Sequence, residues 1–230
     1  MHNGRAPLDS GYVRRRFNIR LKRMFATMSN TKERIFDEAL KLFSKNGYEA
    51  SSVRDISGKL GMTQAALYKH YKNKQAIFDS IVNRMKENER TRAGEYNMPA
   101  ITDDPDSPAF KNLSVSQLKL YSLIQFLYWT EDEFASSCRK MLCLEQYHNY
   151  QAGFLYQQYL VNGQFMYMEK IISELIRQGQ WAEGDAWDMA VEYYGPILAM
   201  IMIYDGTEDK ESVKAKLKAH LANITKKYKK

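Results

Sequence analysis

A run of polar and basic side chains between Met62 and Lys74 contains no acidic residue. Its members are small residues, hydrogen-bond donors and one amphipathic ring: Thr63, Gln64, Ala65, Tyr68, Lys69, His70 and Lys74. The amide of Gln64 can pair with the edge of a base, whereas phenol, imidazole and ammonium groups can donate to phosphate oxygens. The small residues would let the backbone approach the floor of a groove. We therefore expect this run to contact DNA.

A short helix is expected to precede this run and support it. Val53, Ile56 and Leu60 fall at i, i+3 and i+7 and give that helix one apolar stripe. Ser52 and Asp55 have the spacing of a capping box, in which each side chain binds the backbone N–H of the other. The helix should therefore begin near Val53. We include Ser52 among the residues expected to contact DNA.

The acid-free run itself is expected to form the second helix of a pair. Gly61 can adopt the left-handed conformation that ends the first helix, and Thr63 can cap a helix over residues 64–71. Leu67 and Tyr71 are its core residues, at i and i+4. Two short helices on either side of a glycine predict a helix-turn-helix. Because so short a helix buries little apolar area, we expect its exposed side to be kept for contact with a partner.

Longer helices flank the helix-turn-helix on both sides. On the N-terminal side, Asn30 and Glu33 predict a capping box for a helix that ends at Gly47. Its apolar face comprises Phe36, Ala39, Leu40 and Phe43. On the C-terminal side, Asn73 can cap a helix that continues to about Arg92. Its apolar positions repeat at i, i+4 and i+8 with Ile77, Ile81 and Met85. This helix would join the DNA-contacting residues to the rest of the chain.

Residues from Thr31 to about Met85 resemble the DNA-binding domain of the tetracycline-repressor (TetR) family of bacterial regulators. The resemblance is carried by IFDEALKLFSKNGYEASSVRDIS and by the later run GMTQAALYKHYKNK. In these runs a Gly, a Thr, a Leu-Tyr pair, an aromatic residue and a Lys stand at that family's spacing. The family often has Ser or Thr, a basic or polar residue and Gly at Thr63, Gln64 and Ala65. It usually has Phe at Tyr71.

The resemblance, which covers about a quarter of the chain, implies a homodimer on a double-stranded DNA operator. The two recognition helices would enter a partly palindromic site about 34 Å apart. A small hydrophobic or aromatic molecule entering the second domain would tilt the helix that starts near Lys74 and release a repressor from its operator. Two alternatives remain at this point, a DNA-binding protein of the same fold without an inducer and a helical enzyme.

The charge balance fits a polyanionic partner without requiring one. The chain has 34 Lys and Arg residues against 27 Asp and Glu residues, a net charge of +7. Much of this charge lies in residues 1–28, which lack the apolar core of a secretory signal. We interpret residues 1–28 as a disordered leader. They could also result from translation that starts upstream of the true initiator, Met24 or Met28. The alternative is a basic arm that reaches DNA.

We expect no catalytic residue, metal ligand or cofactor. The histidines are scattered, and neither a glycine-rich phosphate loop nor a nucleophile elbow is present. Cys138 and Cys143 lie roughly 140° apart around a helix, so they should form neither a disulfide nor a metal pair. Free thiols favour a cytoplasmic location. The longest apolar run is too short to span a membrane.

The whole chain is predicted to be all-α, with a helix-turn-helix DNA-binding domain over residues 29–75 and a helical ligand-binding and dimerisation domain over residues 76–230. Residues 76–93 of the second domain form the connecting helix. A loop is expected over residues 94–108, where Gly, Asn, Asp and Pro gather. The remaining helices are predicted over residues 114–130, 131–146, 148–160, 163–177, 186–204 and 209–226.

The second domain is rich in aromatic residues, which could fill its core or line a cavity for a drug-sized molecule. Periodicity does not separate these alternatives, so we name a candidate ligand-binding set. It consists of Tyr121, Phe126, Trp129, Tyr147, Tyr150, Phe154, Met166 and Tyr194.

The helix that begins after Asp185 is apolar on every side from Ile197 to Ile203, with the sequence ILAMIMI. A helix of this kind must be covered all round, either by a second subunit or by the rest of its own chain. Paired with the last helix, it predicts a four-helix bundle across a two-fold axis. The residues expected at this interface are Ile197, Ile201, Tyr204, Leu217 and Leu221.

Overall fold

The computed structural model describes residues 31–101, 103–104, 107–111 and 113–230. Its helices are α2 (Thr31–Asn46), α3 (Val53–Lys59), α4 (Gln64–Tyr68), α5 (Lys74–Glu95), α6 (Pro108–Lys111), α7 (Val115–Glu131), α8 (Glu133–Glu145), α9 (Tyr150–Leu160), α10 (Asn162–Arg177), α11 (Ala186–Gly206) and α12 (Lys210–Tyr228). An isolated antiparallel bridge joins Trp181 to Lys229, and no strand occurs in the described residues. The all-α prediction is confirmed. The expected leader, residues 1–28, and the Asn30 cap lie outside the described residues.

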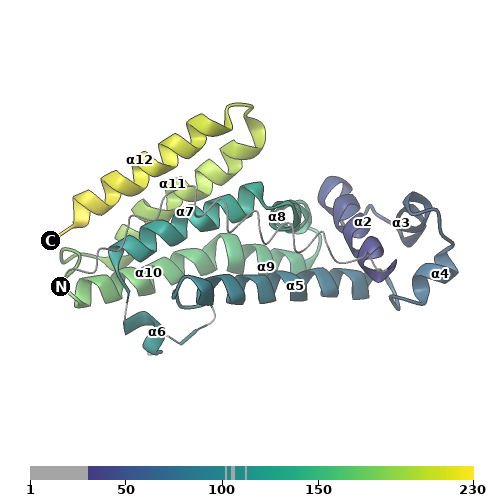
Figure 1. Ribbon diagram of the computed structural model, residues 1–230, viewed down its shortest axis with the longest axis horizontal. Helices are drawn as coiled ribbons and strands as arrows, with labels where there is room; N and C mark the ends of the chain where they lie inside the picture. The colour runs from purple at the N-terminus through teal and green to yellow at the C-terminus, as the bar shows by residue number, and fades with distance from the viewer. Residues whose placement is uncertain (1–30, 102, 105–106, 112) are drawn as a thin grey trace, which may run out of the picture.

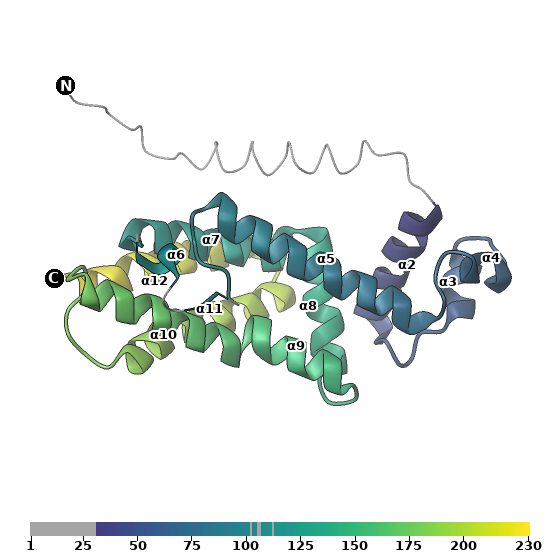
Figure 2. The same ribbon diagram turned by 90° about the horizontal axis from the view of Figure 1, so that it is seen from below.

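The helices gather into two parts that are joined by α5 (Figure 1). Helices α2, α3 and α4 form a small group at one end of the molecule. Helix α5 begins in this group and runs along the bundle that contains α7, α9 and α10. Helices α11 and α12 lie beside each other on the outside of that bundle. Figure 2, seen from below, shows α8 next to α2, so the two parts also meet away from α5.

The helix boundaries around the turn follow from local capping, as predicted. The Asp55 backbone N–H donates to the Ser52 hydroxyl at 3.1 Å, and the Ser52 N–H donates to the Asp55 carboxylate at 2.9 Å. Gly61 adopts a left-handed φ of +64° after α3. The side chains of Thr63 and Asn73 accept backbone N–H groups in the first turns of α4 and α5. These caps satisfy N–H groups that the helices cannot satisfy themselves.

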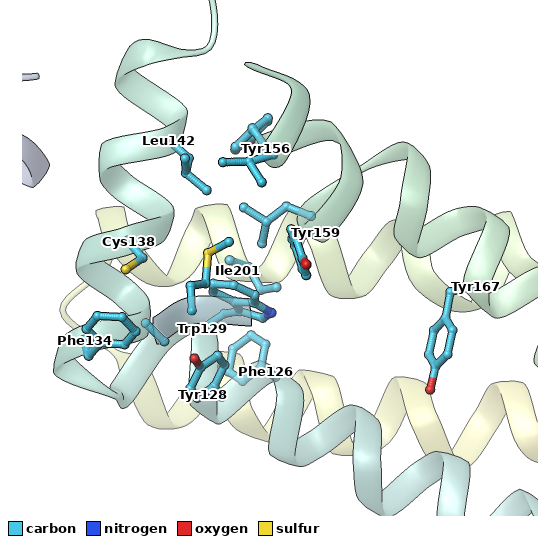
Figure 3. Packing of buried hydrophobic residues seen from close by; sticks show 14 of the residues in the cluster. Phe126, Tyr128, Trp129, Phe134, Cys138, Leu142, Tyr156, Tyr159, Tyr167 and Ile201 are labelled. Carbon is cyan, nitrogen blue, oxygen red and sulfur yellow. The ribbon is translucent and has the colours of Figure 1, made fainter. Parts of the chain in front are cut away.

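Aromatic side chains of the second domain pack into a continuous core (Figure 3). The rings of Tyr128 and Trp129 meet edge to face with centroids 5.0 Å apart. The rings of Phe126 and Tyr204, from α7 and α11, meet edge to face at 5.5 Å. Ile201 of α11 lies in the same region (Figure 3). Such contacts stabilise a core beyond its buried area alone, and here they fix the positions of the surrounding helices.

Two predicted boundaries were wrong. Helix α4 ends at Tyr68 rather than Tyr71, because the His70 N–H donates to the Leu67 carbonyl in a tighter turn. This turn leaves Tyr71 buried in the core. The expected loop after the connecting helix also starts later, since α5 continues to Glu95, and an unpredicted short helix, α6, begins at Pro108 where the loop was expected to end.

Both cysteines are free thiols, Cys138 buried and Cys143 half-buried. Burial raises the pKa of Cys138 well above its ordinary value, so this thiol stays protonated. No cluster of His, Cys, Asp and Glu suited to a metal ion occurs in the described part of the chain. The described helices also include none that combines the length and apolarity needed to cross a bilayer.

Candidate nucleic-acid interface

The outer side of α4 is exposed and carries no carboxylate. The exposed residues of α4 and its flanks include Thr63, Gln64, Ala65, Tyr68, Lys69 and His70. The ring of Tyr68 is 48% exposed, whereas Leu67 is fully buried. The structure therefore gathers the predicted DNA-contacting residues of this segment on one accessible surface. The hydrogen-bond donors of these exposed side chains are accessible to a polyanion in solution.

The acid nearest in sequence to this surface belongs to the cap of α3. The Ser52 hydroxyl donates to the Asp55 carboxylate at 2.6 Å. This hydrogen bond and the one from the Ser52 backbone hold the pKa of Asp55 below its ordinary value of 3.8. Ser52 is exposed, as a phosphate-contacting residue must be, but its hydroxyl proton is already used within the cap. Its main structural role is to begin α3.

Lys74 lies at the start of α5, where it clamps the loop that joins α2 to α3. Its ammonium group donates to the backbone carbonyls of Tyr48 at 2.8 Å and Ser51 at 3.1 Å. It also lies 4.1 Å from the centre of the Tyr48 ring. An ammonium group has three donors, so at most one remains for a phosphate. We predicted the phosphate contact from the sequence but not the clamp.

Exposed basic residues near α4 enlarge the surface beyond the predicted set. They are Arg54 and Lys59 on α3 and Lys72 after α4. The signal that could have found them is their alternation with buried residues such as Ile56 and Tyr71. These cations add positive charge to the surface, and contacts from them to phosphates would not distinguish one base sequence from another.

An ion pair and a stack of rings join α2 to the second domain. The Arg84 guanidinium of α5 forms a bidentate pair with the Glu33 carboxylate of α2, with one N–O distance of 2.8 Å. The same guanidinium lies 3.7 Å from the centre of the Phe36 ring. The Phe36 ring stacks on Phe134 of α8 with centroids 5.9 Å apart. Movement of α8 would therefore act directly on α2.

A second connection joins the loop after α2 to the end of α8. The buried Glu145 carboxylate accepts the Glu49 backbone N–H at 3.3 Å. A Cβ atom at Gly47 would lie 2.5 Å from this carboxylate, and Gly47 itself has a φ of +91°. Only glycine fits both conditions. The amide of Gln75 on α5 also donates to Gln151 of α9 at 3.2 Å.

The structure does not bring the candidate ligand-binding residues together. Tyr121, Phe126, Trp129 and Tyr194 are buried, whereas Tyr147, Tyr150, Phe154 and Met166 are exposed. Tyr147 and Tyr150 are 85% and 90% exposed, so they cannot line a closed cavity with the buried set. Phe154 and Met166 border an open groove of about 430 Å³ between α9 and α10. The set named from sequence is therefore not one site, because helical spacing alone did not show which face of each helix turns inward.

A buried polar cluster between α5 and α7 was not predicted. We call it the Arg92 cluster, and it consists of Glu89, Arg92, Tyr121, Gln125 and Tyr128. The Arg92 guanidinium donates to the Gln125 side-chain oxygen at 2.9 Å, and the Gln125 amide donates to the Tyr121 hydroxyl at 2.5 Å. Glu89 and Arg92 continue the inward positions of α5 at i+4 and i+7 from Met85. Charged residues at apolar positions were the signal that could have found the cluster.

The candidate dimer residues lie in the core of their own chain. Ile197, Ile201, Tyr204, Leu217 and Leu221 are all buried without any partner subunit. Burial within the chain, the alternative considered from the sequence, accounts for this inner side of α11. The large apolar residues that α11 exposes are Trp187, Val191, Met202 and Ile203. These four exposed side chains, which we call the outer row of α11, are accessible to a second subunit.

Comparison with known sequences finds relatives of the helix-turn-helix part of the chain. The family described as bacterial regulatory proteins, tetR family, matches residues 35–81. The biofilm operon icaADBC negative transcriptional regulator IcaR of Staphylococcus epidermidis is 43% identical over 51 residues, which are 22% of this chain and 28% of that protein. The class D tetracycline repressor protein of Escherichia coli is 33% identical over 69 residues, 30% of each chain. The chain matches about a third or less of the length of such curated relatives.

Comparison with solved structures extends over both domains. The complex of SmeT with triclosan superposes with a TM-score of 0.64 and 21% sequence identity, covering 87% of this chain and 92% of SmeT. SmeT is described as the repressor of a multidrug efflux pump of Stenotrophomonas maltophilia. At this identity the similarity shows a shared fold. The helix-turn-helix of this chain therefore matches the tetR family of bacterial regulatory proteins over residues 35–81, and both of its domains share the fold of SmeT.

Proposed function

We propose that this protein is a cytoplasmic, homodimeric repressor that binds a DNA operator and releases it when a small molecule binds the second domain. The observation that carries the proposal is the exposed, acid-free side of α4. A surface of amide, phenol, imidazole and ammonium groups suits the major groove and its phosphates. Leu67 and Tyr71 hold this surface in place from inside.

Two copies would be joined through the outer sides of α11 and α12. The exposed row of Trp187, Val191, Met202 and Ile203 on α11 gives the apolar part of this surface. Exposed alanines on α12, Ala215, Ala219 and Ala222, allow close approach of another helix. A two-fold axis here would place both α4 helices on one side of a duplex, about one helical turn apart.

The response to a ligand would pass through both connections to α2. A ligand that moves α5 or α8 would act on the Arg84–Glu33 pair and on the stack of Phe36 with Phe134. To release the operator, the ligand needs only a higher affinity for the conformation that cannot bind DNA than for the conformation that can. That SmeT, a repressor of similar fold, was solved with triclosan supports a small organic effector.

Selection of bound duplexes from random DNA tests the proposal. The purified full chain should enrich a partly palindromic sequence whose half-sites lie about one helical turn apart. Alanine at Gln64 should alter the enriched bases, whereas alanine at the exposed Lys41 of α2 should not. If no sequence is enriched, even at low salt where phosphate contacts are strongest, the protein is not a sequence-specific regulator.

A further inference from the structure

Arg92 is a buried cation that forms no ion pair with a carboxylate among the described residues. Its side chain donates to the Gln125 oxygen at 2.9 Å and to the Asn88 carbonyl at 3.4 Å, and it lies 3.5 Å from the centre of the Tyr128 ring. Arg92 is 5% exposed, and its Nε–H has no hydrogen-bond partner in the described part of the chain. None of the ion pairs formed among the described residues includes it. A buried guanidinium is normally matched by an anion, because an unmatched charge in an apolar core is costly.

The Tyr128 hydroxyl is a second unsatisfied group at the same place. It is buried, and no described residue accepts its proton. Burial raises the pKa of Tyr128 to about 12, so the hydroxyl keeps its proton at neutral pH and can donate it. Arg92 and Tyr128 therefore present two buried donors side by side. An acceptor with two oxygens would satisfy both.

Glu89 lies one helical turn before Arg92, yet it does not form an ion pair with it. Its carboxylate accepts the Ile101 backbone N–H at the long distance of 3.4 Å. Burial raises the pKa of Glu89 above its ordinary value of 4.5. The Ile101 hydrogen bond and the nearby Arg92 charge lower the same pKa, so Glu89 interacts with Arg92 through space without a direct ion pair.

A short segment separates the Arg92 cluster from an open groove. Met98 and Ala100 are buried, and the Tyr167 hydroxyl donates to the Pro99 carbonyl at 2.7 Å. Ile101 and Tyr167 also line the groove of about 430 Å³ between α9 and α10. Its other lining residues are Phe154, Gln157, Gln158, Asn162, Gly163, Met166 and Lys170, with no acid among them.

We propose that Arg92 and Tyr128 bind the carboxylate of a small organic acid whose apolar or aromatic body lies in this groove. The volume of the groove falls in the range of ligand sites, about 300–1,000 Å³. The acid would displace the Tyr167–Pro99 hydrogen bond and place its head group against the two unsatisfied donors. This inference rests on the proposed function, since it identifies the chemical class of the effector.

The charges at the site distinguish an acid from other ligands. An amine would bring a second cation next to Arg92, and an alcohol can accept both hydrogen bonds but brings no negative charge to balance the guanidinium. A carboxylate can accept from the guanidinium and the phenol together, and such charge-assisted hydrogen bonds are the stronger kind. Lys170 at the groove would attract the same sign of ligand.

Calorimetric titration of the purified full chain with matched probes tests the inference. The aromatic series is 2-naphthoate, 2-naphthylmethanol and 2-naphthylmethylamine, and the aliphatic series is decanoate, decanol and decylamine. In at least one series the acid should bind about tenfold or more tightly than the alcohol and the amine. An equal or reversed order in both series, or no binding of either acid, would overturn the assignment.

Variants then locate the carboxylate. Arg92→Met should abolish the preference for the acid and leave alcohol binding unchanged, whereas Arg90→Met, an exposed change on the same helix, should have no effect. Tyr128→Phe should weaken acid binding several-fold without lowering the melting temperature, because it removes an unsatisfied hydroxyl. Glu89→Gln should strengthen acid binding by removing a competing negative charge. Loss of the preference in Lys170→Met but not in Arg92→Met would show that the site is wrong.

DNA binding by the same preparations separates this inference from the proposed function. A wild-type chain that binds its selected duplex but neither acid would leave the regulator intact and refute the carboxylate site. A chain that binds the acids through Arg92 but selects no duplex would support the site and refute the regulator. If the regulator proposal and the carboxylate site are both correct, the preferred acid lowers the affinity for the duplex. Arg92→Met should abolish this effect.

Discussion

The ammonium group of Lys74 donates to the backbone carbonyl oxygen of Tyr48 at 2.8 Å, and the hydroxyl of Tyr48 donates to Gln75 at 3.0 Å. The start of α5 and the loop after α2 are therefore tied together by two neighbouring side chains. Because α4 lies between these segments in the chain, the clamp fixes the angle at which its outer side is presented. This makes Lys74 a structural residue as well as a candidate phosphate contact.

Replacing Lys74 by Ala should lower both stability and DNA affinity. Loss of the hydrogen bonds to Tyr48 and Ser51 should reduce the free energy of unfolding by about 1–3 kcal/mol. The exposed Lys72 is the matched control, since Lys72→Ala should reduce the salt dependence of DNA binding without changing stability. Denaturant unfolding and salt titrations measure the two effects separately. Unchanged stability in Lys74→Ala would mean that the clamp contributes nothing.

Replacing Gln64 by Ala should change which bases are preferred. Loss of a good base contact is worth about 1–3 kcal/mol at the base pair concerned and should leave other positions unaffected. Binding to single-base variants of the selected operator measures this pattern. An equal loss on every duplex, including a scrambled one, would show that Gln64 contacts the backbone of DNA rather than a base.

Placing charges on the outer row of α11 should separate the subunits. Met202 and Ile203 are exposed in the single chain, so Met202→Glu combined with Ile203→Glu should preserve the fold and give monomers in sedimentation. Leu144→Glu, an exposed change on α8, is the control and should remain dimeric. Ile201 is unsuitable for this test because it is 1% exposed, and glutamate there would unfold the chain. A stable dimer of the double variant would place the interface elsewhere.

The Glu33–Arg84 pair should make stability depend on acid pH. The hydrogen bond from Arg84 holds the folded-state pKa of Glu33 below its ordinary value of 4.5. The stabilisation is therefore complete above about 4.5, the value expected in the unfolded chain, and is lost as pH falls through the lower folded-state value. Because both side chains are more than a third exposed, the effect should be small and reduced by salt.

Denaturant unfolding of Glu33→Gln against pH measures this contribution. The variant should be less stable than the wild type at neutral pH, and the difference should shrink at acid pH. Glu38→Gln on the same helix is the control. A difference that is constant with pH would show that ionisation of Glu33 does not stabilise the joint.

Features fixed by nearest neighbours in the chain could be predicted from sequence. The Ser52 and Thr63 caps and the left-handed Gly61 each depend on residues within one turn, so their types and spacing were sufficient. The exposure of Gln64 and Tyr68 followed from the i, i+4 spacing of the two buried residues, Leu67 in α4 and Tyr71 just after it. The exposure of the candidate DNA-contacting surface could be predicted for this reason.

Features that depend on distant partners could not be predicted. Glu145 reaches the Glu49 backbone from the far end of α8, and nothing near either residue indicates the contact. Periodicity also fails for tyrosine, which suits a core and a surface alike. Tyr194 is buried and donates to the Leu160 carbonyl, whereas Tyr150 is almost fully exposed. The helix faces that meet other helices decide these cases.

The most direct test is the affinity of the selected duplex for Ala65→Glu compared with the wild-type chain. Ala65 lies on the exposed side of α4, so glutamate there should preserve the fold while placing a negative charge against phosphates. Fluorescence anisotropy should show tight, sequence-dependent binding by the wild-type chain and loss of that binding in the variant, with unchanged thermal melting. Wild-type affinity in Ala65→Glu would contradict the assignment of this surface to DNA.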